Sequence, residues 1–567
     1  MFDLILMKKL LIFYLWCFSL FAGAQEALHF ASPFDFPLYL SANFGELRPN
    51  HFHGGLDIKT QGVIGKQVQV VADGYVSRIS VSPSGYGNAI YVVHPNGYTS
   101  VYGHLDSFVP QIARYVREQQ YKQESFAVNL FPDSTLFHFK QGEVIALSGN
   151  TGSSGGPHLH LELRETTTNE LIDPLPFYMH LLKDTRRPLS KGIMLYAFPG
   201  QGVVNGSSRK QNFVWHSGGA SLNRPVNAWG KIGVAIRAND YMTDTSNVYG
   251  VRSIRLLVDS IEVFCSVTDR VSFLENRAIN GWIDYDVYRR TRSLYAKSFL
   301  LPGSSLRLTR SSASDRGWVT IDEERDYHFL YILEDSFGNV SRYSFVVHGQ
   351  QQPILPYKHS GNRILKWNKV NNITFPGMQV VIPKGMLYED VEIDAGMEKD
   401  STSVSFVYRL HDKILPLHDF CSIKIGVRDT SALIDSSKYY IAEKTGKSMR
   451  YIGGEWKDGW LEGKIRNLGT YTVGFDTIPP TITPLNRNRW TSSGRISLNV
   501  SDKQTGMASY KGKIDGRFVL FECNRYYSRL TCNLRKEQIK RGSIHTLEMT
   551  VVDNRGNKTV YTEKFRY

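Results

Sequence analysis

Two short segments of the 567-residue sequence concentrate histidine and carboxylate side chains. They read H-F-H-G-G-L-D over residues 51–57 and H-L-H-L-E over residues 158–162. Because side chains alternate along a strand, His158 and His160 point to one face. His53 and Asp57 also share a face if their segment is extended. Two such strands would bring imidazoles and a carboxylate to one point, which is the donor set of a catalytic zinc that keeps a fourth position for water.

The spacing does not decide which histidines are ligands. Four of them, at positions 51, 53, 158 and 160, compete for three or four roles, and an H-x-H pattern also occurs in structural strands. Glycines flank both segments and let backbone or substrate approach closely. Zinc held there would lower the pKa of its water to about 7 and polarise a carbonyl, so the chemistry that fits is hydrolysis.

Short strands must position these residues. The chain has 31 Tyr and 30 Phe, and this content favours strands over helices. Residues 88–102 are predicted to form a hairpin, because Asn96-Gly97 stands between two apolar alternations. Residues 108–122 carry apolar side chains at helical spacing, which predicts a helical insertion packed against the sheet. The alternative is a lid that covers the substrate.

Several motifs, in order along the chain, resemble the lysostaphin-type (LytM-like) zinc endopeptidases. His53-Gly-Gly-Leu-Asp57 matches the family's H-x-G-x-D motif, and His158-Leu-His160 matches its H-x-H motif. The other similar stretches are Phe44–Arg48, Val71–Val76, Tyr86–Asn88, Tyr102–Leu105 and Ser148–Gly152. The resemblance covers residues 40–175 and implies an antiparallel-sheet peptidase domain. The long connection between His104 and Gly142, which holds the predicted helix, departs from the family pattern.

The resemblance also implies roles for individual residues. His53, Asp57 and His160 would be the zinc ligands. His104 and His158 would be catalytic histidines that do not bind the metal but position or deprotonate the attacking water and stabilise developing charge. Without the resemblance, His104 would be read as a buried structural histidine.

Four further residues are expected near the site. Glu162 lies on the same strand face as His158 and His160 and would support a ligand; the alternative is that it only pairs with Arg164. Arg48, Ser153 and Ser154 are expected to contact substrate, with an ordinary surface role as the alternative for Arg48. His51 matches no ligand position, and His94, before Pro95 at a turn, is expected to be exposed.

The N-terminus predicts export. Lys8 and Lys9 precede an apolar run, Leu10–Phe21, that ends at Ala22-Gly-Ala24, a pattern typical of a secretory signal peptide. The run is too short for an ordinary membrane span, so we expect no integral membrane segment after cleavage; the alternative is an uncleaved anchor. The protein would then be periplasmic, associated with the cell envelope or secreted.

The net charge of +14 favours an anionic partner. No dense Lys/Arg block occurs, which argues against nucleic acid. The resemblance implies peptide stems of peptidoglycan as substrate.

The remaining two-thirds of the chain is predicted to be β-sandwich. D-x-x-G-N-x-x-x-Y occurs at Asp335–Tyr343 and at Asp553–Tyr561, each after an apolar strand, which indicates a turn between the last two strands of a sandwich. The expected fold class is mainly β, a peptidase domain with a helical insertion followed by Ig-like sandwiches. The predicted domains are a signal peptide at 1–24, the LytM-like zinc peptidase at 25–185, an Ig-like sandwich at 186–352, a middle β-domain at 353–476 and a C-terminal Ig-like sandwich at 477–567.

Cys523 and Cys532 flank a predicted hairpin turn. They are expected either to form a cross-strand disulfide, which an oxidising compartment permits, or to be two half-buried thiols. The sequence leaves both alternatives open.

The function expected from these observations is a zinc metalloendopeptidase that hydrolyses peptide cross-links of peptidoglycan through a metal-activated water. The alternative is a non-catalytic LytM-like protein that binds the wall or activates another hydrolase. A third reading is a scaffolding protein, in which the sandwich domains dock a cell-envelope partner.

Overall fold

The computed structural model describes residues 30–567 except 217–220, 312–314, 401–402, 429–434 and 525–527. The predicted signal peptide, residues 1–24, lies outside the described residues. Within the described part of the chain, no helix combines the length and the apolar character needed to cross a bilayer.

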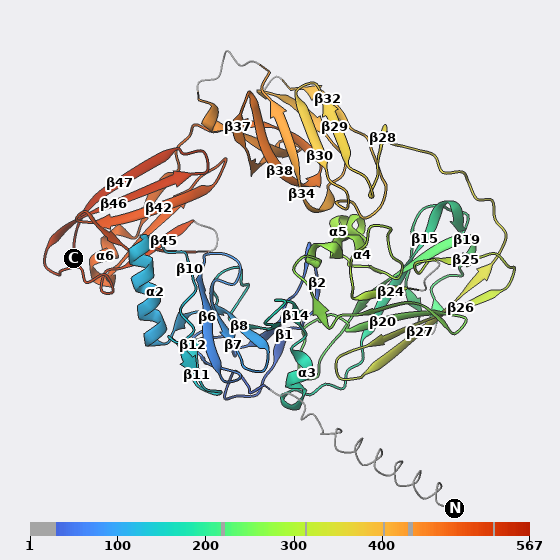
Figure 1. Ribbon diagram of the computed structural model, residues 1–567, viewed down its shortest axis with the longest axis horizontal. Coiled ribbons are helices and arrows are strands. Elements are labelled where there is room, and N and C mark those ends of the chain that lie inside the picture. The colour runs from blue at the N-terminus through green and yellow to red at the C-terminus, as the bar shows by residue number, and fades with distance from the viewer. Residues whose placement is uncertain (1–29, 217–220, 312–314, 401–402, 429–434, 525–527) are drawn as a thin grey trace, which may run out of the picture.

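The chain is mainly β, as predicted, and its first region is built on one antiparallel sheet (Figure 1). The strands in spatial order are β1 (Leu40–Ala42), β4 (Leu56–Lys59), β13 (His158–Glu165), β8 (Tyr98–Leu105), β7 (Asn88–Val93), β6 (Gly74–Val81) and β10 (Val128–Leu130). At its margins β11 (His138–Phe139) pairs with β6, and β14 (Leu171–Ile172) pairs with β13. The predicted hairpin is confirmed, since β7 and β8 are joined by the turn at Pro95–Gly97.

The predicted helical insertion is also confirmed. Helix α2 (Pro110–Gln123) begins with proline at its first turn, where the missing amide hydrogen costs nothing, and ends at Glu124 in the left-handed conformation. Its buried side chains, Ile112, Val116 and Gln120, face the sheet. The helix follows β9 (Ser107–Phe108), which pairs with β12 (Val144–Leu147) and through it with β5 (Gln67–Gln69).

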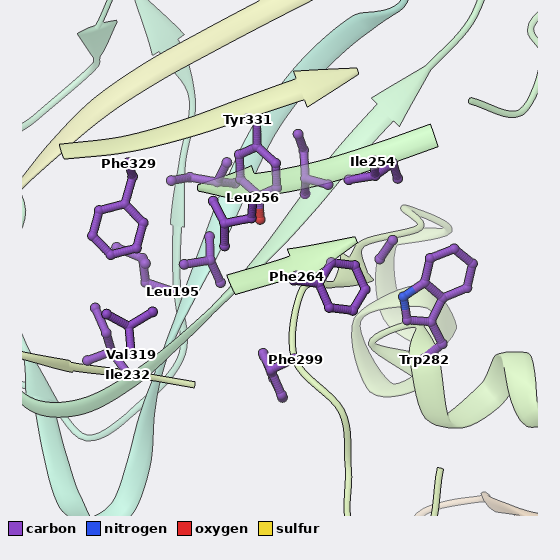
Figure 2. Close-up of a cluster of buried hydrophobic side chains, with 14 of the residues drawn as sticks. Leu195, Ile232, Ile254, Leu256, Phe264, Trp282, Phe299, Val319, Phe329 and Tyr331 are labelled. Atoms are coloured by element: carbon purple, nitrogen blue, oxygen red, sulfur yellow. The ribbon is translucent and has the colours of Figure 1, made fainter. Parts of the chain in front are cut away.

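The second region is one sheet that folds around its own core rather than two separate sheets. The path is β16 (Gln211–Phe213), β15 (Leu189–Val204), β19 (Asn227–Asn239), β27 (Val340–Gly349), β26 (Asp326–Glu334), β20 (Ser253–Val258), β21 (Ile261–Val267) and β24 (Thr309–Ser311). Figure 2 shows Leu256, Phe264 and Tyr331 among the apolar side chains inside it. The short helices α4 (Ile279–Trp282) and α5 (Tyr285–Thr291) cover one end, where Trp282 enters the core.

The third and fourth regions are two-layer sandwiches, each with its own core. The third packs β29 (Asn371–Phe375), β30 (Met378–Ile382), β34 (Leu415–Gly426), β38 (Trp460–Leu468) and β37 (Glu455–Lys457) on β32 (Gly396–Lys399), β33 (Phe406–Arg409), β39 (Thr470–Phe475), β35 (Tyr439–Thr445) and β36 (Ser448–Gly453). The fourth packs β40 (Thr481–Leu485), β41 (Arg495–Ser501), β45 (Arg529–Asn533) and β44 (Glu522–Cys523) on β43 (Arg517–Val519), β42 (Met507–Ile514), β46 (Ile544–Asp553) and β47 (Lys558–Arg566).

The repeated D-x-x-G-N motif forms the same turn twice. It joins β26 to β27 and β46 to β47, the last two strands of their regions. The Asn339 amide donates to Asp335 Oδ1, and the Asn557 amide donates to Asp553 Oδ1, both at 2.8 Å. In each case the aspartate side chain accepts a hydrogen bond from the backbone of its own turn and stabilises it, as the residue types indicated.

The peptidase region and the second region share side chains. Met242 and Tyr249 lie in the core of the peptidase sheet, while Phe44 and Phe52 lie in the core of the second region. Strand β22 (Arg270–Val271) extends the peptidase sheet by pairing with β14. The predicted domain boundary at residue 186 stays a proposal. Residues from both sides of this boundary contribute to each of the two cores.

The C-terminal sandwich packs against the peptidase region, so the four regions are arranged in a ring (Figure 1). Arg117 of α2 donates to Glu537 at 2.9 Å and to the Lys536 carbonyl at 2.7 Å, and the Tyr121 hydroxyl also contacts Glu537. The Tyr121 and Phe518 rings meet edge to face, with centroids 5.4 Å apart. One face of α2 thus packs on the peptidase sheet and the other holds the last sandwich.

The structure contains Cys523 and Cys532 as thiols. They lie on the paired strands β44 and β45, so a hairpin is present, but Leu530 is the residue opposite Cys523. Cys532 is two residues further along and points into the core, where it is 0% exposed. The register therefore favours the second of the two alternatives, free thiols.

We predict that Arg117→Ala loosens the contact between α2 and the C-terminal sandwich. It removes two hydrogen bonds, one of them to a charged partner, and such bonds each contribute about 1.5–3 kcal/mol. Amide hydrogen exchange should accelerate at the end of α2 and around Glu537. Arg114→Ala, an exposed position of the same helix, is the control. Unchanged exchange in the Arg117 variant would contradict the assigned contact.

Candidate metal centre

Strand pairing brings Asp57 and His160 together. Antiparallel β4 and β13 are in a register that places His160 directly opposite Asp57, and His160 Nδ1 lies 2.8 Å from Asp57 Oδ1. His53 Nε2 is 3.1 Å from the same oxygen and 3.2 Å from His160 Nδ1. All three side chains are buried, and their nearest donor atoms lie within 4.8 Å of one another.

His53 does not lie in a strand. It stands between β3 (His51–Phe52) and β4. The prediction that His53 and Asp57 share a face assumed a continuous strand, and residues 53–55 do not form one. A close approach of backbone takes its place. A Cβ on Gly55 would lie 2.3 Å from the Leu161 carbonyl oxygen, so only glycine lets this loop press against β13.

Hydrogen bonds to the far nitrogens orient both imidazoles. His53 Nδ1 donates to the Asn43 carbonyl at 2.7 Å, which leaves Nε2 directed at Asp57. His160 Nε2 donates to Glu162 Oε1 at 3.0 Å, which leaves Nδ1 directed at the same point. Such outer hydrogen bonds fix the tautomer and orientation of ligand histidines. No motif in the sequence points to Asn43.

Glu162 is itself held on both oxygens. The Tyr86 hydroxyl donates to Oε1 at 2.6 Å, and Arg164 donates to Oε2 at 2.8 and 2.6 Å. Burial would raise the pKa of Glu162, but Arg164, His160 and Tyr86 lower it to about 2. The carboxylate both supports His160 and pairs with Arg164, so the two sequence readings coexist. Tyr86 lies in one of the matching motifs, but its contact with Glu162 was not foreseen.

The centre favours positive charge. Burial opposes protonation of His160, yet the hydrogen bonds that it donates to Asp57 and Glu162 raise its pKa to about 9. Burial also works against ionised Asp57, and its contacts with His53, His158 and His160 nevertheless hold its pKa well below the usual range. Two imidazole nitrogens and a carboxylate oxygen around one point form the three-ligand set of catalytic zinc. The residues present therefore fit a zinc ion.

His104 and His158 lie beside this triad. The ring centroid of His104 is 4.8 Å from that of His158 and 5.7 Å from that of His160. His104 Nδ1 donates to the Thr151 carbonyl at 2.9 Å and His158 Nδ1 donates to the Gly156 carbonyl at 2.8 Å. In the neutral His104 ring the lone pair is therefore on Nε2, while His158 Nε2 lies 3.5 Å from Asp57 Oδ1. Burial, followed by the neighbouring His160 and His158, lowers the pKa of His104 to about 4, so His104 is neutral near pH 7.

The backbone at His104 is strained. Its φ is +61°, which a residue with a side chain seldom adopts and which costs about 1–3 kcal/mol. The structure holds this conformation at the end of β8, where the His104 amide donates to the Tyr86 carbonyl at 2.8 Å. Strain of this kind clusters at functional sites.

The residues expected to contact substrate lie at the rim. Arg48 is 3.7 Å from Asp57 Oδ2 and donates to Glu46 at 3.2 Å, with its side chain 37% exposed. Ser153 is exposed, and its hydroxyl accepts from the Gly85 amide at 3.0 Å. Ser154 is buried, 3.2 Å from His158 Nδ1.

Two other histidines lie away from the triad. His51 is exposed and contacts the Pro49 carbonyl, outside the ligand group as expected. The expectation that His94 is exposed was wrong. It is 3% exposed, because its ring bridges the Asp73 carbonyl and the Ser100 hydroxyl beneath the hairpin.

A groove of about 910 Å³ lies between the peptidase region and the C-terminal sandwich, and its lining includes Ser154, whose hydroxyl is 3.2 Å from His158 Nδ1. Its peptidase wall includes Asn150, Thr151, Ser154 and Gly155, and its other wall includes Leu520, Glu522, Asn524 and Lys536. The contact of α2 with the last sandwich therefore shapes this groove.

Two family models match parts of the chain. The model of peptidase family M23 matches residues 51–121, and that of the Zu5-like domain matches residues 362–476. The first range contains His53, Asp57 and His104, so the chain carries an M23 (LytM-like) domain, as its motifs predicted. The second range falls within the predicted middle β-domain.

Curated relatives match the same domain. An uncharacterized metalloprotease of Haemophilus influenzae is 31% identical over 27% of this chain and 26% of that protein. DD-carboxypeptidase/endopeptidase Mpg of Neisseria meningitidis is 31% identical over 20% of each. Murein hydrolase activator NlpD of Salmonella dublin is 34% identical over 19% and 22%. The match therefore spans about a quarter or less of each relative's length.

Among solved structures, the catalytic domain of lysostaphin from Staphylococcus simulans is 24% identical. That comparison covers 24% of this chain and 89% of the other, with a TM-score of 0.18.

We predict that Glu162→Gln weakens zinc binding 10- to 100-fold, the usual effect of changing a partner of a metal ligand. The variant keeps the shape of the side chain but removes the charge that holds the His160 proton. Competition with a chromophoric chelator measures the affinity. Glu165→Gln, at the end of the same strand, is the control. Equal affinities in the parent and the Glu162 variant would contradict the role of this network.

Proposed function

We propose that this chain, which carries an M23-type domain, is a zinc-dependent endopeptidase that hydrolyses peptide cross-links of peptidoglycan. The observation that carries the proposal is the complete ligand set. His53, Asp57 and His160 converge on one buried point, and both imidazoles are oriented by separate hydrogen bonds. Zinc, when bound, lowers the pKa of water and polarises a peptide carbonyl.

His104 and His158 supply the proton transfer in this proposal. Each Nδ1 is bonded to a backbone carbonyl, which leaves Nε2 as the nitrogen available for proton transfer. The low pKa of His104, caused by burial and by the neighbouring histidines, keeps that ring able to accept a proton at neutral pH. Charge that develops on the substrate would then be stabilised by the protonated imidazoles and by Arg48.

The substrate proposal rests on charge, on the groove and on relatives. The net charge of +14 suits an anionic wall polymer, and the groove lined by Ser154 could hold an extended peptide. One relative is named a DD-carboxypeptidase/endopeptidase, which supports a cross-link between D-amino acid and diamino acid residues. We further propose that the protein is exported to the periplasm or cell envelope, where its sandwich domains dock an envelope partner.

The second candidate is an activator of another wall hydrolase. The relatives named murein hydrolase activator support it, and so does the C-terminal sandwich that forms one wall of the groove. The full ligand triad and the two further histidines favour the enzyme, since a protein that only binds needs none of them.

We predict that the purified full chain contains about one zinc and releases cut cross-links from purified sacculi. Asp57→Ala and His160→Ala should abolish both, because each removes a ligand. His51→Ala, a neighbouring histidine outside the triad, is the matched control and should keep both. A folded parent without zinc and without cleavage would favour the activator, and active ligand variants would refute the site.

A second prediction separates ligands from proton-transfer residues. His104→Asn should lower kcat by about 10²–10⁴-fold, the usual contribution of a general acid or base, while zinc content stays near one per chain. Mass spectrometry of released muropeptides gives the rate, and metal analysis of the same sample gives the occupancy. Loss of zinc in this variant would instead make His104 a ligand.

A further inference from the structure

A second cluster of acidic side chains shares no residue with the zinc triad and lies where the peptidase region meets the second region. Asp184 precedes β15, Asp240 follows β19 and Asp335 follows β26. Their carboxylate oxygens lie within 4.8 Å of one another. The three residues are only 8%, 4% and 2% exposed, which is unusual for ionisable side chains.

Hydrogen bonds satisfy only part of this cluster. Asp184 Oδ1 accepts from the amides of Arg186 and Thr243 at 3.0 and 2.9 Å, and Asp335 accepts on both oxygens from Asn339. By contrast, Asp184 Oδ2 and Asp240 Oδ1 are buried and have no hydrogen-bond partner among the described residues. Burying such atoms without a partner costs free energy, so each instance calls for an explanation, and a bound cation is one.

The cluster is also short of positive charge. Arg186 is the nearby cation, but its guanidinium donates to the Met242 and Thr245 carbonyls rather than to a carboxylate. Burial, together with the adjacent Asp335 and Asp184, raises the pKa of Asp240 to about 8. A cation among the three carboxylates would remove both the repulsion and the unpaired oxygens.

The same arrangement recurs in the C-terminal sandwich. The carboxylate oxygens of Asp476, Asp502 and Asp553 also lie within 4.8 Å of one another. Both groups combine Asp-Thr before the first strand, Asp-x-x-Thr after a central strand, and the Asp-x-x-Gly-Asn turn. Thr243 Oγ1 donates to Asp184 at 3.1 Å, and Thr505 Oγ1 donates to Asp476 at 2.8 Å. What sets the first group apart is its two buried carboxylate oxygens without partners.

We propose that Asp184, Asp240 and Asp335 bind a Ca²⁺ ion. Every donor in the group is a carboxylate oxygen, which suits a hard cation rather than zinc or copper. Calcium also accepts irregular geometry and six to eight oxygens, so carbonyls and waters can complete a site built from three separate chain segments. This inference is independent of zinc and of the proposed peptidase activity.

The position of the cluster gives the ion a structural task. Met242, Tyr249 and Phe337, from the two loops that carry Asp240 and Asp335, all pack against the peptidase core. The Tyr249 hydroxyl donates to the Leu40 carbonyl at 2.8 Å. The ion would fix the corner of the second region against the peptidase sheet.

The segment that follows Asp240 also contacts a residue that supports the zinc site. The Gly250 amide donates to Asn43 Oδ1 at 2.8 Å, and the Asn43 side chain donates back to the Gly250 carbonyl at 2.9 Å. Asn43 is the residue whose carbonyl orients His53. A calcium ion at Asp240 would therefore stiffen a segment that supports a zinc ligand.

Titration calorimetry of the full, zinc-loaded chain with CaCl₂ tests the proposal. We expect saturable Ca²⁺ binding in the parent, weaker Mg²⁺ binding, and a melting temperature that rises with Ca²⁺ by mass action. Asp240→Asn should lose the binding at this site and the rise in melting temperature. Without calcium it should melt no lower than the parent, because the oxygen that it replaces is buried and has no hydrogen-bond partner among the described residues.

Asp244→Asn is the matched control, because it removes one exposed carboxylate four residues away and should bind Ca²⁺ as the parent does. Asp502→Asn, in the second group, should also keep binding at the first site. The proposal is overturned if the parent neither binds Ca²⁺ nor melts higher with it at several millimolar. Undiminished binding in Asp240→Asn, or Mg²⁺ binding as tight as Ca²⁺ binding, would overturn it equally.

Discussion

The register between β4 and β13 is the constraint on which the rest of the site depends. It sets His160 opposite Asp57 and places His158 and Glu162 on the same face of β13. A slip of one residue would turn that whole set of side chains to the other face of the sheet. Gly55 is needed for this arrangement. The loop that carries His53 approaches the Leu161 carbonyl so closely that a Cβ at position 55 would clash with its oxygen. Metal ligands, orienting groups and proton-transfer residues are thus all fixed by one strand pair and one close backbone contact.

Charge then determines what this geometry can hold. Arg164 and Tyr86 stabilise the Glu162 carboxylate, Glu162 holds the Nε2 proton of His160, and His160 Nδ1 faces Asp57. This alternation of charge runs through a buried region where each group would be costly alone. It leaves a position between His53, Asp57 and His160 that stabilises a cation. The acidic cluster at Asp184 follows the same logic with oxygen donors only, and there the surrounding groups supply fewer partners.

Much of this could be predicted from the sequence, for physical reasons that differ between residues. The ligand triad and the helix at 110–123 could be predicted because motif spacing and apolar periodicity can be read from short segments of sequence. His94 was misjudged because a turn signal says nothing about the side chain beneath it, which the Asp73 carbonyl and Ser100 bury. The contact of Tyr86 with Glu162, the support of His53 by Asn43, the closure of α2 on Glu537 and the Asp184 cluster arise from contacts between separate segments, which the motif spacings do not reveal. The domain boundary predicted at residue 186 follows a change in the sequence pattern. In the fold, Met242 and Tyr249 lie beyond that boundary but share a core with peptidase residues.

The central claim is that His53, Asp57 and His160 hold a zinc ion. Anomalous diffraction measured on both sides of the zinc absorption edge, from crystals of the full chain, tests it most directly. The account predicts one strong peak bonded to His53 Nε2, Asp57 and His160 Nδ1, with His104 and His158 outside bonding distance. No peak in crystals grown with zinc, or a peak bonded to His104 or His158 in place of a member of the triad, would contradict it.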